Sequence, residues 1–556
     1  MVIQSLKPNP NLVKECKEEL RDNYIGYFDK TTVHGLRYLT EPRRPWPERV
    51  LWFIGLSIAL VACSWLMYDT YSRWVQSPVI STSDETQRNI WQIPFPAVTI
   101  CPKAKSKGLN YTRFVNMYQR GQLDHRQMNI FLKLQMVCTV SIAEQDMGET
   151  VDNATANVIE NHALNKEDVI CDADTLGIKA QFQSVLTEEG VCFTYNMIPG
   201  IDLFREGTFQ ANRNKNINSP KSNVTWDPVN GYQKGSDDCY PHTASGLGRN
   251  AGLWLLLHTK TKELHSLCNL MGHGFKVILH SPIDFPQSEH ESVHVSLENV
   301  FHLTLTPHEM RTAPPLRHSY SPQQRQCYFP DERYLKYFKY YSQRNCELEC
   351  LSNQTLEKCG CVEFYLPRMP NTPVCGWKSK ACIEKAKVDL YKTAAFPSGS
   401  HGKIDSSLKY TLTCKCFPSC THIWYKSTWS TSEMSQQIKK HFFGRCMKRN
   451  EEDIRRSIIF VYYKDPLFIP IRRVEVFGTT DLLASMGGLM GLCMGVSLLS
   501  VIEFFYWMLI RPFCQRIKQS NPQLRSIRKA FTKDNVEASV QYSKHLDEKA
   551  ENQQGP

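Results

Sequence analysis

The sequence lacks the local motifs on which two common enzyme classes depend. It has no esterase-type nucleophile turn and no glycine-rich phosphate loop, so we do not expect an enzyme. It has no internal repeats, and no cluster of Lys and Arg with aromatic residues of the kind that binds nucleic acid. Its mean hydropathy is negative, which excludes a transporter with many membrane spans. We expect no cofactor and no resident metal ion.

Cysteine is abundant. The 556 residues, more than one ordinary domain needs, include 21 cysteines, and such usage is typical of an oxidising compartment. The formal net charge of +11 is a modest excess for this length. We attribute it to a solvated surface and to basic residues that flank membrane segments.

A first apolar run extends from Val50 to Tyr68 without a charged residue. At ~1.5 Å per residue it is long enough to cross a bilayer core of ~30 Å. The basic residues Arg43, Arg44 and Arg49 precede it, which argues against a buried helix of a soluble protein. The run begins too far from the N-terminus, and is too long, for a cleaved signal peptide.

A second apolar run lies between Asp481 and Glu503 and continues to Ile510, interrupted by four glycines. Basic residues follow it at once, so both basic flanks lie outside the pair of runs and both termini are predicted to be cytosolic. The expected organisation is a cytoplasmic segment 1–49, a membrane helix 50–70, an extracellular domain 71–480, a membrane helix 481–512 and a cytoplasmic tail 513–556.

Two further patterns agree with this topology. All four Asn-X-Ser/Thr glycosylation sequons fall between the two runs, at Asn110, Asn153, Asn223 and Asn353. Seventeen of the cysteines also lie there. We therefore expect a glycosylated, disulfide-bonded extracellular domain.

Within this domain, alternating apolar and polar residues predict several strands. They are Pro96–Cys101, Gly274–Leu279, Val293–Leu297, Phe301–Leu305, Ile458–Tyr462 and Val474–Phe477. Two stretches, Asp331–Cys350 and Ser432–Phe443, are predicted helices, and residues 200–250 are predicted to form loops. The polar tail after about residue 518 is predicted to be disordered.

Cysteines are densest between Cys327 and Cys420 and include two Cys-X-Cys pairs. Such pairs can hold zinc, but in an extracellular domain disulfides are the favoured interpretation. Cys346 and Cys350 are about one helical turn apart, so both would face the same partner. We interpret the cluster as a staple between a helix and the segment Cys414–Cys420.

Several motifs follow one another along the chain. They are Thr32-Val-His34-Gly35-Leu-Arg-Tyr38, Phe95-Pro-Ala-Val-Thr-Ile-Cys101, Gly190-Val-Cys192-Phe-Thr-Tyr-Asn196, Tyr341-Ser-Gln-Arg-Asn-Cys346, Cys359-Gly-Cys-Val-Glu-Phe-Tyr-Leu-Pro367 and Gly491-Leu-Cys-Met-Gly495-Val-Ser497, followed by Glu503. Their order resembles that of the epithelial sodium channel/degenerin/acid-sensing ion channel superfamily, and their residues are most similar to those of the insect pickpocket branch.

This resemblance implies an α+β membrane protein that forms a homo- or heterotrimer with related subunits in membrane lipid. Each subunit would have two membrane helices and a disulfide-rich ectodomain with a β-sheet palm and a helical thumb. The implied disulfides are Cys101–Cys192, Cys327–Cys420, Cys346–Cys416, Cys350–Cys414, Cys359–Cys382 and Cys361–Cys375. For the remaining cysteines we expect Cys138–Cys171 and Cys239–Cys268, with Cys446 unpaired because the total is odd.

The resemblance also implies a sodium-selective or sodium-preferring cation channel subunit of a sensory or epithelial cell, amiloride-sensitive and opened by an extracellular stimulus. A pore must replace part of the water shell of Na⁺ with oxygens. Gly495, Val496 and Ser497 would form this selectivity filter. The alternative for the glycines is close packing of helices through small residues.

Five further residues have expected roles. Glu503 would concentrate cations below the filter, or else be an interfacial acid near the headgroups. Asp481 would attract cations at the outer mouth, or else cap a helix. It stands where degenerins carry a small residue whose enlargement opens the channel, so that effect is in doubt here. The resemblance places blockers at Gly491 and gating at His34 and Gly35.

Three other functions compete with a conducting subunit. A non-conducting receptor or adhesion protein would not need the glycine-broken second run. A two-span ATP-gated channel lacks the His-Gly and Cys-Gly-Cys motifs. An obligate partner subunit would conduct only in a heterotrimer. The Pro-Pro-X-Tyr tail motif of epithelial channels is absent, so ubiquitin-ligase control by that route is not expected. The stimulus does not follow from the sequence.

Overall fold

The computed structural model describes residues 21, 24–41, 44–76, 79–107, 110–144, 146–214, 224–233, 239–264, 268, 272–289, 292–394, 414–438, 453–476 and 478–514. The chain divides into two compact units. One comprises Met1–Pro78 with Glu475–Pro556, and the other comprises Val79–Val474. Each unit is described by itself.

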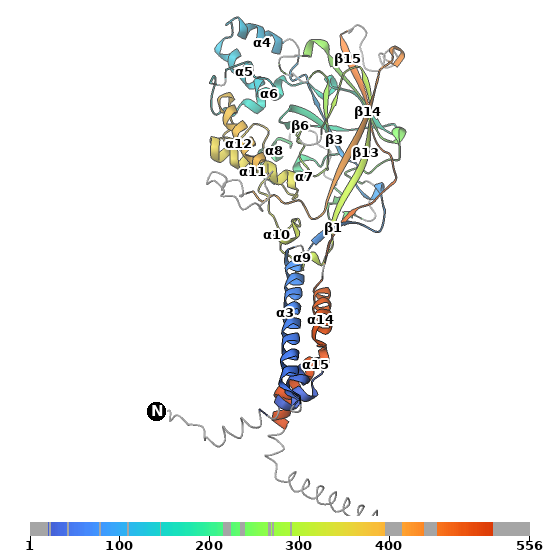
Figure 1. Cartoon of the computed structure of the whole chain (residues 1–556). Coiled ribbons are helices and arrows are strands. Elements are labelled where there is room, and N and C mark those ends of the chain that lie inside the picture. The colour runs from blue at the N-terminus through green and yellow to red at the C-terminus, as the bar shows by residue number, and fades with distance from the viewer. Residues whose placement is uncertain are drawn as a thin grey trace, which may run out of the picture. The chain divides into compact units, whose positions relative to one another are not determined.

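The first unit consists of helices. They are α2 (Leu36–Thr40), α3 (Trp46–Gln76), α14 (Thr479–Met494), α15 (Leu498–Phe505) and a π-helix, Tyr506–Ile510. The apolar part of α3 covers the 30 residues Trp46–Val75, roughly 45 Å of helix, which is enough to cross a bilayer. Helices α3 and α14 pack side by side (Figure 1).

The second apolar segment is not one straight helix. Thr479–Met494 and Leu498–Cys514 are bent by 75° at a short break, and they pass for a span by length and composition only when taken together. The break falls at the three residues predicted to form the filter. The described part of this unit therefore contains one clear apolar span and a second, broken one.

The second unit contains both strands and helices. Its strands are β1 (Val79–Ser83), β2 (Arg88–Asn89), β3 (Ala97–Pro102), β4 (Ile170–Thr175), β5 (Ile178–Lys179), β6 (Phe182–Thr187), β7 (Gly190–Tyr195), β8 (Trp226–Asp227), β9 (Gly231–Tyr232), β10 (Leu253–Lys260), β11 (Phe275–His280), β12 (Ser292–Val295), β13 (Asn299–Thr312), β14 (His422–Glu433), β15 (Ile454–Tyr463), β16 (Leu467–Phe468) and β17 (Ile471–Glu475).

Most of these strands form two sheets, while β2 with β16 and β8 with β9 form separate pairs. The larger has the order β1-β17-β13-β15-β10-β4-β5, with β14 also paired to β13, and the smaller has the order β12-β11-β3-β7-β6. Strand β13 runs parallel to β15 and β17 but antiparallel to β14. Its alternate residues Phe301, Leu303 and Leu305 are buried, as expected for a strand with one face on the core.

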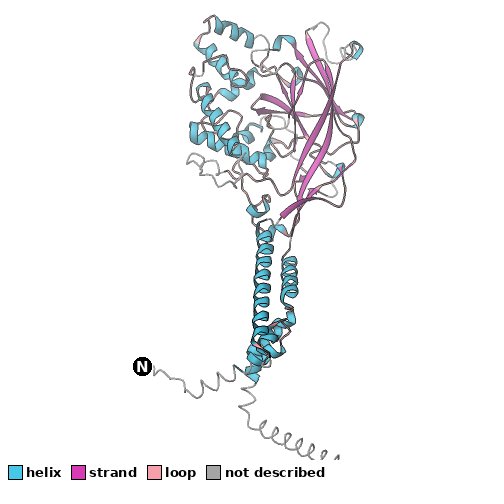
Figure 2. Ribbon diagram, in the orientation of Figure 1, coloured by secondary structure: helices cyan, strands magenta, loops and turns pink. Residues whose placement is uncertain are grey.

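The helices of this unit gather beside the strands (Figures 1 and 2). They are α4 (Asn110–Gln119), α5 (His125–Gln135), α6 (Thr155–His162), α7 (Gly200–Leu203), α8 (Phe209–Asn214), α9 (Leu316–Ser319), α10 (Pro322–Arg325), α11 (Gln343–Cys359) and α12 (Lys380–Ala394), with 3-10 turns at Ile90–Gln92, Lys166–Asp168, Arg249–Ala251, Thr261–Glu263 and Trp377–Ser379.

All six disulfides implied by the family resemblance are present in the structure. The two other expected pairs are wrong, because Cys138 pairs with Cys268. The backbone explains this choice. The N–H of Thr139 donates to the carbonyl of Cys268 at 2.9 Å, whereas Cys171, itself disulfide-bonded, lies in strand β4. The expected unpaired residue, Cys446, lies outside the described residues.

Both predicted helices of the ectodomain need correction. The helix expected at Asp331–Cys350 begins only at Gln343, because the Ser342 hydroxyl accepts the N–H of Asn345 at 3.1 Å and caps it there. It continues to Cys359, and Gly360 ends it in a left-handed conformation. In the second stretch, Ser432–Phe443, the first two residues belong to β14, and residues from 439 on are outside the described part.

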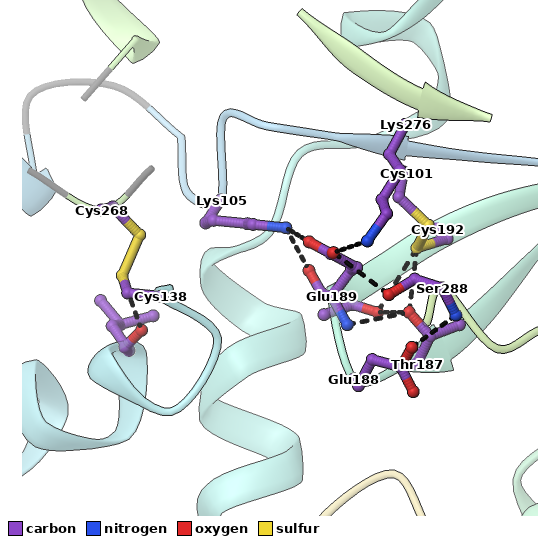
Figure 3. Close-up of polar contacts among 12 residues, drawn as sticks. Cys101, Lys105, Cys138, Thr187, Glu188, Glu189, Cys192, Cys268, Lys276 and Ser288 are labelled. Carbon is purple, nitrogen blue, oxygen red and sulfur yellow. Dashed lines mark hydrogen bonds and ion pairs between the residues drawn. A yellow bond between two sulfur atoms is a disulfide. The ribbon is translucent and has the colours of Figure 1, made fainter. Parts of the chain in front are cut away.

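A buried ion cluster joins β3, β7 and β11 (Figure 3). The Glu189 carboxylate accepts hydrogen bonds from the ammonium groups of Lys105 at 2.6 Å and Lys276 at 2.9 Å. Burial alone would raise the pKa of Glu189, but the positive charges of Lys105, Lys103 and Lys276 outweigh it and hold the pKa well below its usual range. The cluster lies next to the Cys101–Cys192 disulfide, and its ion pairs add a second link between neighbouring segments of the smaller sheet.

Candidate functional site

The break in the second apolar segment begins at Gly495. Helix α14 ends at Met494, and Gly495 adopts a left-handed conformation with φ of +69°. Its N–H still bonds to the carbonyl of Gly491 at 2.9 Å, which closes the last turn. Glycine is the residue that adopts this conformation without strain. The glycine therefore lets the chain leave helical geometry here.

Ser497 starts the next helix. Its hydroxyl accepts the N–H of Ser500 at 3.3 Å, and the Ser500 hydroxyl accepts the N–H of Ser497 at 3.1 Å. This reciprocal pair caps α15 in the manner of a capping box. The three residues predicted to form a filter, Gly495 to Ser497, are therefore the linker between two capped helices.

A turn from the N-terminal segment, Thr32–Gly35, bonds to both sides of this linker. On the α14 side, the N–H of His34 donates to the carbonyl of Met494 at 2.9 Å. On the α15 side, the Thr32 hydroxyl lies 2.7 Å from the Ser500 hydroxyl and donates to the Glu503 carboxylate at 3.1 Å, and the Thr32 N–H donates to the same carboxylate at 3.3 Å. We call this segment the Thr32–Gly35 turn.

Two glycines are needed where this turn meets the helices. Gly35 has φ of +88°, and a Cβ there would lie 2.6 Å from the Cδ1 of Leu56 on α3. A Cβ on Gly495 would lie 2.4 Å from the Nδ1 of His34. The predicted gating residue His34 therefore packs directly against the predicted filter, whereas Gly35 packs against α3.

Helix α14 has two distinct faces. Seven side chains are half-buried, namely Leu482, Ser485, Met486, Leu489, Met490, Cys493 and Met494. The Sγ of Cys63 on α3 lies 3.9 Å from the carbonyl of Leu489. Residues Ala484, Gly487, Gly488 and Gly491 are exposed on another face. A Cβ on Gly487 or Gly488 would meet no atom within 4 Å. Packing inside this chain therefore does not require these two glycines.

The two predicted pore acids both have backbone partners. The Asp481 carboxylate, at the third position of α14, accepts the N–H of the N-cap residue Gly478 at 3.0 Å. Glu503 is tied to Thr32 as described above. The two acids stand on separate helices, Asp481 on α14 and Glu503 on α15.

Spacing in the sequence does not reveal the partners of these residues. Thr32 and Ser500 complete the link between the turn and α15, and Thr32 lies within the His-Gly motif itself. Farther along, a Cβ on Gly26 would lie 2.8 Å from Trp507 of the π-helix, and the guanidinium of Arg511 lies 3.7 Å from the centre of the Trp507 ring. The contact between Gly26 and Trp507 is long-range and carries no local signal.

Two of the predicted glycosylation sites are exposed in the second unit. Asn353 is exposed on α11, and Asn153 is exposed although its side-chain oxygen accepts the N–H of Val374 at 2.9 Å. Asn110 begins α4, and Asn223 lies outside the described residues. Both exposed sequons are accessible for a glycan.

One stretch of the ectodomain carries the residue order of a zinc-protease motif. Residues 290–294 read His-Glu-Ser-Val-His. His294 lies in strand β12, whereas that motif needs a helix to bring both histidines to one face. The order alone therefore does not indicate a metal site here.

Comparison with known proteins now identifies the family. The profile described as "Amiloride-sensitive sodium channel" matches residues 27–507, which include the Thr32–Gly35 turn, the ectodomain and the break at Gly495. The chain belongs to the amiloride-sensitive sodium channel family. It is thus a degenerin/epithelial-type cation channel subunit, as the motifs indicated.

Named relatives place it near the insect pickpocket branch. "Pickpocket protein 28" of Drosophila melanogaster is 28% identical over 514 residues, covering 89% of this chain and 79% of the relative. "Pickpocket protein 19" of the same organism is 21% identical, covering 90% and 94%. The mouse "Bile acid-sensitive ion channel" is 24% identical over 500 residues, covering 86% and 87%.

A solved structure was also matched. The cryo-EM structure of a proton-activated chloride channel aligns over 83% of this chain and 98% of that one, with a TM-score of 0.28 and 6% identity. This likeness is too low to support an argument about the fold or the function of the amiloride-sensitive sodium channel family member described here.

Proposed function

We propose that this chain is a subunit of a plasma-membrane channel that prefers Na⁺, is blocked by amiloride and is opened by an extracellular stimulus. The observation that carries the proposal is the Thr32–Gly35 turn, which is bonded to both sides of the break at Gly495. A membrane helix that only anchors a protein needs neither a capped break nor a second segment fastened across it.

The break suits the chemistry of a filter. Two capped helices leave Gly495, Val496 and Ser497 as the irregular backbone between them. Irregular backbone at membrane depth is tolerated where it is buried in protein or lines water. The carbonyl and hydroxyl oxygens of these residues, repeated around an axis, would replace part of the Na⁺ water shell.

The exposed glycine face of α14 supports the same proposal. Gly487, Gly488 and Gly491 meet nothing within this chain that a side chain would displace, apart from a Val496 carbonyl 3.8 Å from a Cβ on Gly491. In an assembly this face would line the ion path or contact another subunit. We propose Gly491 as the blocker site above the filter, and Glu503 as the acid that concentrates cations below it.

The assembly follows from the family. We propose a homo- or heterotrimer with both termini in the cytosol, and with glycans on the exposed Asn153 and Asn353. The stimulus would act on the ectodomain. Movement of the Thr32–Gly35 turn relative to the break would couple the two membrane helices of each subunit to opening.

The test is expression of the full chain in a non-native cell, alone and with related subunits. We expect a current whose reversal potential follows Na⁺ and which amiloride blocks. In the variant Gly491→Cys, a charged, membrane-impermeant thiol reagent applied from outside should block the current, and the same reagent should leave the parent chain and an Ile469→Cys control conducting. Surface-expressed protein that carries no current in any assembly, or a Gly491→Cys current that the reagent never alters, would refute the proposal.

A further inference from the structure

Two thiols from different membrane helices meet beside the break. Cys63 on α3 is 2% exposed, and the thiol of Cys493 on α14 is its neighbour across the two helices. Its sulfur also lies 3.9 Å from the carbonyl of Leu489, one turn before Cys493. Neither cysteine is in a disulfide. Two independent contacts therefore place the pair in the seam between α3 and α14.

A third sulfur lies on the same face of α14. Met490 precedes Cys493 by three residues, and side chains three apart are neighbours on a helix. Both residues are half-buried, and Met486 lies on the same face one turn earlier. The seam is therefore rich in sulfur where most helix pairs present only carbon. Thiolate and thioether sulfurs are the ligands that soft metal ions such as Cu(I) select.

We propose that Cys63 and Cys493 form a two-sulfur binding site for a soft d¹⁰ monovalent cation, Cu(I) or Ag(I), with the Met490 thioether as the nearest further donor. Binding forms two sulfur–metal bonds, and the proton of at least one S–H bond leaves to water. No atom changes its oxidation state. With one thiolate and one monovalent cation the site is electrically neutral, which suits a seam between apolar helices, where an uncompensated charge is costly.

The position of the site indicates what a bound ion would do to the two helices. Cys493 is two residues before Gly495, and its neighbour Met494 accepts the bond from the Thr32–Gly35 turn. An ion held by Cys63 and Cys493 would therefore tie α3 to the last turn of α14, next to the break. Access through the ion path rests on the proposed function, but binding itself does not, so it is measured without recording current.

The probe is Cu(I), supplied without oxygen in competition with the chromogenic chelator bathocuproine disulfonate, on the full chain in detergent with its disulfides intact and its free thiols reduced. The variants are Cys63→Ser, Cys493→Ser, the double variant, and Met490→Leu. Cys514→Ser is the matched control, because this exposed thiol lies on the same unit and away from the pair. The readout is the number of Cu(I) ions bound per chain and their affinity relative to the chelator.

We expect one tight equivalent to disappear in Cys63→Ser and in Cys493→Ser, and the double variant to lose no more than either single one, because both thiols hold the same ion. Met490→Leu should weaken that equivalent by at least about tenfold, the scale on which even outer-shell partners act. Cys514→Ser should keep it. Equal binding by parent and Cys63→Ser, or a loss in Cys493→Ser alone, would overturn the proposal.

A variant that fails to assemble does not leave the question open. X-ray absorption at the copper edge of the parent protein, loaded with one equivalent of Cu(I), reports the neighbouring atoms directly. A shell made of sulfur supports the site, and a shell of nitrogen or oxygen refutes it.

Discussion

The main-chain N–H of His34 donates a hydrogen bond to the carbonyl of Met494, the last residue of α14, at 2.9 Å. A segment that precedes the first apolar helix in the sequence thus completes the end of a helix near the other end of the chain. Because helix C-termini leave carbonyls without intrahelical partners, this bond supplies one of the missing donors. The contact connects the His-Gly motif to the proposed filter through the main chain.

Removing the Thr32 hydroxyl should change how readily the channel opens. Thr32→Val deletes the hydroxyl's bonds to Ser500 and to the Glu503 carboxylate but keeps the main-chain N–H bond to that carboxylate. A hydrogen bond to a charged group is worth about 1.5–3 kcal/mol. If one gating state lacks these bonds, open probability should shift roughly tenfold or more. Single-channel recording in a conducting assembly measures it.

Two variants serve as controls for this prediction. Thr32→Ser keeps the hydroxyl and should behave like the parent. Thr40→Val removes a hydroxyl that only bonds to the carbonyl of Arg37 in the same short helix. Equal open probabilities in Thr32→Val and Thr40→Val would show that the bonds to α15 play no part in gating.

Enlarging Gly495 should alter permeation, whereas enlarging Gly487 should not. Alanine at Gly495 would be strained at φ of +69°, and its Cβ would clash with the His34 ring, 2.4 Å away. Gly487 has open space around the same atom. We expect Gly495→Ala to shift the Na⁺/K⁺ permeability ratio or to abolish current, measured by bi-ionic reversal potentials. Adding His34→Ala should relieve part of the defect, because it removes the clash but not the strain. An unchanged ratio in Gly495→Ala would place the filter elsewhere.

Neutralising Glu503 should lower conductance and leave selectivity nearly unchanged. Glu503→Gln keeps an oxygen that can accept the Thr32 hydrogen bonds but removes one negative charge per subunit. Attraction for cations falls with charge and is screened by salt. Unitary current should therefore fall most at low ionic strength, with little change in reversal potential. A shift in reversal potential without loss of unitary current would instead make this acid part of the selecting ring.

The buried ion cluster should give the ectodomain an acid-sensitive component of stability. Because the folded pKa of Glu189 is depressed, its contribution is complete above the unfolded pKa of about 4.3 and is lost as pH falls through the folded value. Breaking a buried ion pair costs about 3–5 kcal/mol, so Glu189→Gln should lower the melting temperature of the detergent-solubilised chain at pH 7. The difference from the parent should shrink as the pH falls below about 4.

The exposed Glu357 provides a control, since Glu357→Gln should melt like the parent at both pH values. A difference that persists undiminished in acid would assign the effect to packing.

The corrected disulfide predicts a pattern of non-additive effects. Cys138→Ser and Cys268→Ser break the same bond, so the double variant should lose no more surface protein than either single one. Loss of one native disulfide typically costs about 2–5 kcal/mol. Cys138→Ser with Cys171→Ser breaks two bonds and should lose more. Quantitative surface labelling separates these outcomes, and additive losses in the Cys138/Cys268 pair would contradict the pairing.

Strands of the ectodomain are more predictable from the sequence than its helices. The sequence pattern predicts β3, β11, β13 and β15, although burial alternates clearly only along β13, whereas every residue of β3 is buried. The helix around Cys346 is predicted to start well before its true first residue, Gln343. The residues before Gln343 suit a helix locally, but tertiary contacts fix them otherwise: Phe338 pairs with Phe204 across the unit, and the N–H of Tyr337 donates to Glu349. The capping residues Ser342 and Gly360 are local signals that mark the true ends.

The candidate site is partly predictable for a related reason. Gly495, Ser497 and the His34-Gly35 pair carry local signals, since each adopts a special turn or cap. Thr32 and Cys63 have no such signal, and neither does the bond of Ser500 to Thr32, because these contacts join residues more than 400 positions apart in the chain. Contacts of that kind exist only once the two apolar helices lie side by side.

The π-helix at Tyr506–Ile510 changes the angular phase of the residues after it. A wide turn of this kind takes one residue more than an α-turn, so every later side chain is rotated by about 100° from where a regular helix would put it. A helical wheel drawn through residues 498–514 would therefore place Arg511 on the wrong side relative to the residues of α15. Deleting a single residue within Tyr506–Ile510 would restore the regular phase, and would turn the basic end of the segment away from the contacts it now makes.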